Sequence, residues 1–94
     1  MFYILNWSIK TENRHKALDR FVSADLSQEQ PDGFRIKCRY HSMGDFTGVV
    51  VFEADNEAAI FQWLLNWNDL VDVEYKPAVE DDEAVRIGKA FLGK

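Results

Sequence analysis

Four segments of the chain alternate apolar and polar residues with a period of two, which is the pattern of a β-strand with one buried face. The clearest is Phe34–His41, in which every second residue is basic. The same period predicts strands over Phe2–Lys10, Phe46–Ala54 and Leu70–Val79. Pro77 has no amide hydrogen to donate, so we expect the end of the last strand to lie at a sheet edge or a bulge.

Three further segments repeat apolar residues at helical spacing. The first covers Glu12–Ser23. The second follows Asp55, whose carboxylate can accept hydrogen bonds from the first free amides of a helix. Its apolar face is predicted to comprise Ile60, Trp63, Leu64 and Trp67, widened by Phe61 and Leu65. A short third helix is predicted to be capped by Asp81 or Asp82 and to stop at Gly93.

Turn residues separate these elements and set the topology. The polar stretch Asp25–Gly33 reverses the chain, and the tetrapeptide Ser42–Asp45 is short enough to close an antiparallel hairpin. The resulting order is βαββαβα, and right-handed crossovers favour a four-stranded antiparallel sheet in the order 4-1-3-2 with both main helices on one face. The sequence therefore predicts a single ferredoxin-like α+β domain over residues 1–94 with an extra C-terminal helix.

The other face of this sheet has no helix to cover it, and we call it the bare face. Strand parity assigns to it Asn6, Ser8, Thr47, Val49, Val51, Glu53, Asp72, Glu74 and the basic row Arg35, Lys37, Arg39 and His41. A two-fold partner laid across this face could bury its central valines and bring the basic row near the partner's acidic edge. We therefore predict a homodimer formed through the sheet face.

Composition narrows the choice of partners. Hydrophobic residues make up 47% of the chain and aromatic residues 14%, which leaves apolar surface for a second subunit. With 16 acidic and 11 basic residues the net charge is -5, so we expect neither nucleic acid nor an anionic membrane surface as a partner. A single cysteine, Cys38, and an amino-terminal segment that reads as a strand rather than a signal peptide favour a cytoplasmic location.

Several short motifs spread along the chain carry a resemblance to a known family. They are Trp7-x-x-Lys10, Arg39-Tyr40-His41, Gly48, Phe52-Glu53, Trp63-x-x-x-Trp67-x-Asp69-Leu70, and Pro77-x-Val79 followed by Asp81-Asp82-Glu83. The chain resembles a family of small, mostly bacterial proteins, domain of unknown function 3303, within the dimeric α+β barrel superfamily. The resemblance implies two ferredoxin-like sheets that face each other, and it transfers no catalytic residue. Members commonly have Trp-His where this chain has Tyr40-His41.

The candidate ligand-binding residues are Asn6, Arg39, His41 and Glu53, all predicted on the bare face. An imidazole such as that of His41 is suited to act as a proton shuttle, and Arg39 could hold a carboxylate or an enolate. A purely structural role for His41, in the hairpin or the dimer contact, is favoured over catalysis because no clear partner for it is visible in the sequence.

The remaining reactive residues have structural explanations. Trp7, Trp63 and Trp67 could line a pocket for a flat apolar ligand, but helical spacing favours core or interface positions for Trp63 and Trp67. Cys38 shares the parity of Phe34 and is predicted to be a buried, inert thiol. The acidic run Glu80–Glu83 fits a helix start, and no metal site or cofactor is expected.

Two classes of function remain from the sequence. One is a homodimer that binds a small apolar ligand or acts in regulation without catalysis. The other is a cofactor-independent enzyme, of the barrel monooxygenase or isomerase type, that acts on a small apolar substrate through His41 and Arg39. The first is preferred because no convincing acid/base pair is present.

Overall fold

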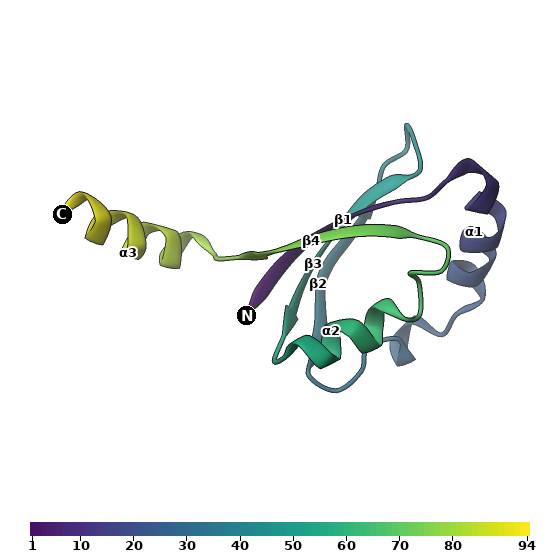
Figure 1. Ribbon diagram of the computed structural model, residues 1–94, viewed down its shortest axis with the longest axis horizontal. Helices are drawn as coiled ribbons and strands as arrows, with labels where there is room; N and C mark the ends of the chain where they lie inside the picture. The colour runs from purple at the N-terminus through teal and green to yellow at the C-terminus, as the bar shows by residue number, and fades with distance from the viewer.

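The computed structural model describes residues 1–94, and its core is a single four-stranded antiparallel sheet (Figure 1). The strands are β1 (Phe2–Ser8), β2 (Phe34–His41), β3 (Thr47–Ala54) and β4 (Asp72–Ala78). Their order in the sheet is β2-β3-β1-β4, which confirms the predicted ferredoxin-like topology. Each predicted strand is present. Strands β1, β3 and β4 are shorter than predicted by one to three residues in total.

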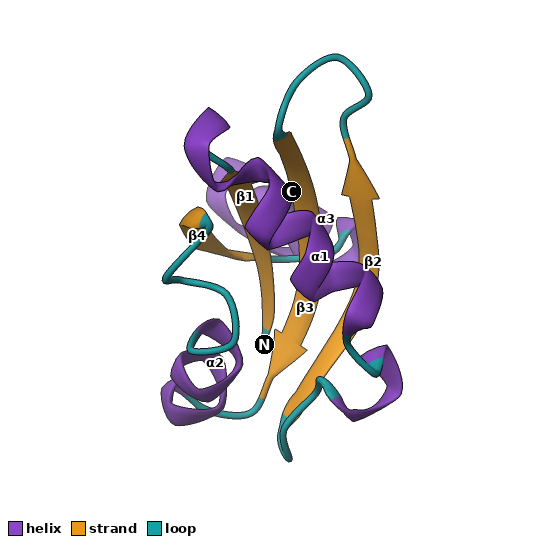
Figure 2. Cartoon of the chain, turned by 90° about the vertical axis from the view of Figure 1, so that its right-hand side faces the viewer, coloured by secondary structure: helices purple, strands orange, loops and turns teal.

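Three α-helices and two short 3-10 turns connect and extend the sheet (Figure 2). The helices are α1 (Arg14–Ser23), α2 (Glu57–Leu64) and α3 (Asp81–Leu92), and the turns are η1 (Thr11–Asn13) and η2 (Leu26–Gln28). No helix is long and apolar enough to cross a membrane.

The helix caps differ in detail from the prediction. The residue that caps α2 is Asn56, whose Oδ1 accepts a hydrogen bond from the amide of Ala59 at 2.9 Å. Asp55, one residue earlier, instead pairs with Arg35. Helix α3 begins after Glu80 rather than after either predicted aspartate, and Gly93 ends it in the left-handed conformation, as predicted.

The hydrophobic core lies between the sheet and α2. Phe52 and Ile60 are completely buried, and Phe52 stacks on both Tyr3 and Phe34 with ring centroids 5.2 and 4.8 Å apart. Trp63 of α2 stacks on Phe34 at 4.7 Å. The other members of the core are Leu5, Val50, Ala54, Ala59 and Leu64.

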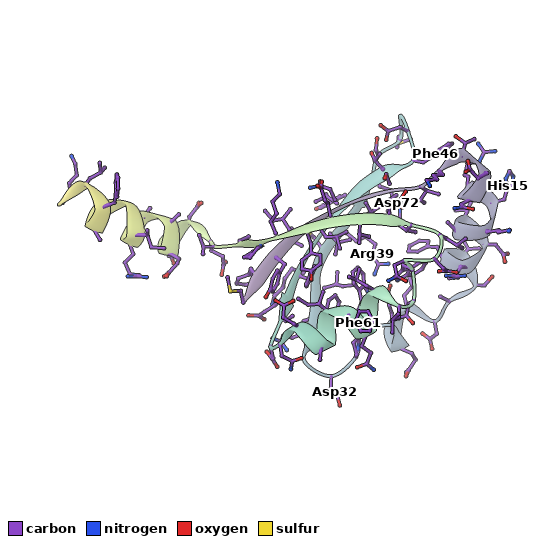
Figure 3. All side chains as sticks on the ribbon, viewed as in Figure 1. His15, Asp32, Arg39, Phe46, Phe61 and Asp72 are labelled. Carbon is purple, nitrogen blue, oxygen red and sulfur yellow. The ribbon has the colours of Figure 1, made fainter.

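Two residues that we expected to widen the apolar face of α2 lie on its outer side. Phe61, labelled in Figure 3, and Leu65 are 61% and 56% exposed. The buried stripe is therefore narrower than the helical wheel suggested. Trp67 lies beyond the end of α2, in the turns that lead towards β4, and packs against the core from there.

The predicted assignment of β2 side chains to the two faces of the sheet is wrong for the second half of the strand, because β2 contains a β-bulge. Ile36 lies opposite Phe52 and Cys38 opposite Val51, so one extra residue of β2 is accommodated between these pairs. Because side chains alternate between faces, one extra residue moves every later side chain to the opposite face. Arg39 and His41 consequently lie on the helix side of the sheet, and Cys38 and Tyr40 lie on the bare face.

Candidate functional site

A pocket of 520 Å³ lies on the helix side of the sheet, next to the packed core. Helix α1 forms one wall through Ala17, Leu18 and Phe21, and the sheet forms the floor. Of the 20 lining residues 15 are hydrophobic, and all three tryptophans of the chain are among them. This volume is within the range of small-molecule sites, and the lining suits an apolar molecule.

The pocket exists because the two helices approach the sheet differently. The side chains of α2 fill the space over one half of the sheet, and four of its eight residues are buried. Helix α1 buries only Ala17, and it lies at the end of the sheet where the β2–β3 hairpin projects (Figure 1). Apolar side chains of α1 such as Leu18 and Val22, 57% and 70% exposed, therefore form an open rim instead of a sealed core.

Arg39 is anchored in the pocket wall by a buried carboxylate. Its guanidinium donates hydrogen bonds to both oxygens of Glu29, at 3.3 and 2.5 Å, and the Glu29 side chain is only 4% exposed. The indole N–H of Trp67 donates to the same carboxylate at 2.8 Å. Arg39 also lies over the ring of Phe21, 5.5 Å from its centroid. Figure 3 shows Arg39 on the side of the sheet that carries the helices.

The Glu29 carboxylate therefore holds three parts of the chain together: the loop before β2, the strand β2, and the turn after α2. A buried ion pair needs compensating hydrogen bonds for its desolvation, and here the Trp67 indole supplies one of them. Glu29 consequently neutralises the charge of Arg39, and both terminal nitrogens of Arg39 donate hydrogen bonds to it. Arg39 does not offer the free positive charge that the sequence suggested for binding an anion.

His41 lies at the rim of the pocket between two aromatic rings. Its ring centroid is 5.2 Å from Trp7 and 5.0 Å from Phe21, both in edge-on geometry. It donates and accepts no side-chain hydrogen bond, and no carboxylate lies within ion-pair distance. The arrangement supplies an aromatic wall but no acid/base pair.

Gly48 makes room for the indole of Trp7. The two residues face each other across β1 and β3, and a Cβ atom at position 48 would lie 2.1 Å from Cζ2 of Trp7. It would also lie 2.3 Å from the carbonyl oxygen of Tyr40. A side chain at this position is therefore excluded, and the indole lies against the backbone of β3, where it forms part of the pocket lining.

Helix α1 is tied to the turn after α2 by an exposed ion pair. Arg20 donates to both carboxylate oxygens of Asp69, at 2.6 and 2.9 Å, and to the carbonyl of Asn66 at 3.0 Å. Hydrogen bonding to this guanidinium lowers the pKa of Asp69 below its usual range. This contact and the Glu29 cluster set the distance between α1 and α2, and so the width of the pocket.

The four predicted ligand-binding residues do not form one site. Arg39 and His41 line the helix-side pocket, whereas Asn6 and Glu53 lie on the bare face, so the prediction of a common face was wrong. Glu53 pairs with Arg35, and this hydrogen bond lowers the pKa of Glu53. Asn6 lies opposite Val49 and Glu74 and borders a shallow hollow of 680 Å³ at the end of the sheet, which His41 also borders.

Sequence reasoning missed Glu29 and Gly48 as residues of the site. Glu29 lies in a polar, turn-rich loop, where a carboxylate looks solvated. Gly48 interrupts the apolar run of its strand, and a glycine inside a strand can signal the close approach of a neighbouring group. Trp63 is a core residue and Trp67 packs against the core, as the favoured interpretation predicted. The alternative that we considered also agrees with the geometry, because all three tryptophans border the pocket. No cluster of residues in the structure could hold a metal ion.

Known structures share this fold at low sequence identity. One is a Deinococcus radiodurans protein provisionally described as an antibiotic biosynthesis monooxygenase, with 15% identity and a TM-score of 0.50 over 85% of this chain and 94% of that chain. Another is a protein of Agrobacterium tumefaciens, with 10% identity and a TM-score of 0.50 over 86% of this chain and 96% of that chain. No curated protein matches the sequence.

At these identities the similarity concerns the fold alone, and it agrees with the ferredoxin-like topology described above. A family match is far more extensive along the sequence, since it covers residues 1–92. The chain therefore belongs to the family described as a domain of unknown function, DUF3303.

Proposed function

We propose that this protein is a homodimer that binds a small apolar ligand in the helix-side pocket and does not catalyse a reaction there. The observation that carries the proposal is the 520 Å³ apolar pocket, which stays open directly beside a tightly packed core. A binding site of this kind needs apolar walls and a few fixed polar groups. Arg39, fixed by Glu29, is such a group, and His41 adds a second polar side chain at the rim.

The absence of a paired acid and base supports binding rather than catalysis. Arg39 is neutralised by Glu29, and His41 has only aromatic neighbours. General acid/base catalysis requires a titrating group within hydrogen-bond reach of the proton that it moves, usually oriented by a second polar group. Nothing in the pocket orients the imidazole of His41 in this way.

We test the pocket with the neutral naphthalene dye prodan, whose emission shifts to the blue in apolar surroundings. We expect saturable binding and energy transfer from tryptophan to the dye, because all three tryptophans line the pocket. Leu18→Asp places a charge at the apolar rim and is expected to weaken binding about tenfold or more, since an uncompensated charge disfavours an apolar ligand. Leu65→Asp is the matched control, because Leu65 is equally exposed but lies outside the pocket.

Equal binding by the two aspartate variants would overturn the proposal. The alternative function, a cofactor-independent enzyme of the barrel monooxygenase or isomerase type, has one point in its favour: His41 and Arg39 both line the pocket. The Deinococcus radiodurans protein of similar fold is provisionally described as an antibiotic biosynthesis monooxygenase. Substrate turnover that His41→Ala abolishes without lowering the melting temperature would favour this alternative.

The bare face supports the homodimer of the proposal. The bulge in β2 places Cys38 and Tyr40 there beside Val49 and Val51, so the edge of this face formed by β2 is more apolar than strand parity predicted. Tyr40 is 67% exposed in the single chain. The predicted pairing of the basic row with a partner's acidic edge loses support, because Arg35, Lys37 and Arg39 all have carboxylate partners within their own chain.

The dimer makes a direct prediction about Val49, which lies at the centre of the bare face. We expect Val49→Lys to shift the mass measured by light scattering from two chains to the 10.9 kDa of one, because two buried ammonium groups would face each other across the two-fold axis. Leu65→Lys, on the outer side of α2, should leave the mass unchanged. A wild-type mass of one chain at micromolar concentration would exclude the dimer.

A further inference from the structure

Helix α3 makes no packing contact with the rest of its own chain. It projects from the end of the sheet opposite α1, so the molecule measures 52 × 32 × 18 Å (Figure 1). The radius of gyration is 15.7 Å, against about 12 Å for a compact domain of this length. None of the residues of α3 is buried.

An isolated helix of this length is only marginally stable in water, so α3 must be stabilised by a contact outside the body of its own chain. Its surface is suited to such a contact. Ile87 and Phe91 lie one turn apart on the same side, and Phe91 is 87% exposed. The first turn is strongly acidic, with Asp81, Asp82 and Glu83.

The chain itself presents a surface with the complementary pattern. On α1, Leu18 and Val22 are exposed one turn apart on the rim of the pocket, and Arg14 lies one turn before them. Arg14 has no ion pair within the chain, and its guanidinium lies over the ring of Phe46. Two helices side by side in the same direction would place Ile87 and Phe91 against Leu18 and Val22, and the acidic turn beside Arg14.

A chain cannot make this contact with itself. Only Val79 and Glu80 separate β4 from α3, and α1 and α3 lie at opposite ends of the molecule (Figure 1). Folding α3 back would require most of β4 to leave the sheet. The surface that fits α3 is therefore available only on another molecule.

We propose that α3 packs against α1 of a second copy of this chain and covers the rim of that copy's pocket. Two copies related by a two-fold axis would exchange their C-terminal helices, so each pocket would be closed by Phe91 of the other subunit. The contact between helices does not depend on ligand binding; only its role as a lid rests on the proposed function.

Crosslinking of the full-length chain tests the contact directly. In a Cys38→Ser background, which removes the only native cysteine, we introduce Leu18→Cys together with Ile87→Cys, the two positions that the parallel packing places opposite each other. Mild oxidation is expected to shift the chain to a covalent dimer on a non-reducing gel, because a disulfide forms only where the two Cα atoms approach within about 7 Å. Lys16→Cys with Ile87→Cys is the matched control, since Lys16 lies on the opposite side of α1, and it should stay monomeric on the gel.

Any other crosslinking result would overturn the proposed contact between α3 and α1. A dimer formed by Ile87→Cys alone would show that α3 pairs with α3 of the partner, and equal crosslinking at positions 16 and 18 would show random collision. No crosslink in any variant would mean that α3 meets something other than this chain. Prodan binding is measured separately, on the Cys38→Ser chain without the introduced cysteines and before oxidation: a crosslink together with no dye binding leaves the contact standing and excludes the ligand site, and dye binding with no crosslink leaves the ligand site standing and excludes the contact.

Discussion

Glu29→Ala is expected to lower the free energy of unfolding by about 3 kcal/mol, the lower part of the range for breaking a buried ion pair. The substitution leaves the Arg39 cation without its counter-charge in a site where its side chain is 17% exposed, and it leaves the indole N–H of Trp67 without an acceptor. Urea denaturation followed by far-ultraviolet circular dichroism measures the loss. For a domain that is marginally stable, this is a large share of the total.

Three further variants identify the cause of this loss. Glu29→Gln keeps an oxygen acceptor for Trp67 and should lower the free energy of unfolding by less than Glu29→Ala does. Adding Arg39→Met to Glu29→Ala removes the unpaired cation, so the double variant is expected to be more stable than Glu29→Ala alone. Glu12→Ala changes an exposed glutamate that has no ion pair and should stay within about 0.5 kcal/mol of the wild type. If Glu29→Ala behaved like Glu12→Ala, the anchoring role of the carboxylate would be excluded.

Gly48→Ala is expected to lower the free energy of unfolding by about 3 kcal/mol, the upper end of the usual range for overpacking. The added methyl group would lie 2.1 Å from the Trp7 indole and 2.3 Å from the carbonyl oxygen of Tyr40. The indole can rotate away, but the carbonyl belongs to the backbone of β2 and can move only with the strand. Thermal and urea unfolding measure the destabilisation, and a shift in tryptophan emission reports the displacement of Trp7.

Gly44→Ala provides a control in the same hairpin. A Cβ atom at position 44 meets no atom within 4 Å, so this variant should change the stability by no more than about 0.5 kcal/mol. In a Trp7→Ala background, Gly48→Ala should lower the free energy of unfolding by less than it does in the wild type. Part of the loss should persist, because the contact with the carbonyl oxygen of Tyr40 remains. Equal stability of the two single alanine variants, with unshifted emission, would contradict the close packing of Trp7 on β3.

Both variants act on the wall of the same pocket, so they also connect stability with binding. Glu29 holds Arg39 and Trp67, and Gly48 admits Trp7. Together these contacts keep three side chains, those of Arg39, Trp67 and Trp7, at fixed positions around a space that is not filled. A pocket of this size beside a tightly packed core is maintained by polar anchors and by backbone clearance, since apolar packing alone would tend to close it.

The candidate site was only partly predictable, and β2 shows why. Alternation placed Arg39 and His41 together, which is correct, because they are two residues apart and follow the bulge. It placed them on the wrong face, because a bulge depends on how the strand pairs with β3 and leaves no signature in the period of the strand itself. The pairing of Arg39 with Glu29 depends on a loop whose conformation is not encoded by any periodicity.

The amino-acid sequence by itself determined the number, type and order of the elements, and through the handedness of the crossovers it determined the sheet order β2-β3-β1-β4. The elements follow from local periodicity, and the sheet order follows from the handedness rule applied to their sequence along the chain. Only the tertiary structure decided that β2 carries a bulge, that α1 stands at the edge of an open pocket, and that α3 leaves the body of the chain. Each of these depends on residues far apart in sequence, such as Glu29 with Trp67 or Trp7 with Gly48, whose meeting no local pattern specifies.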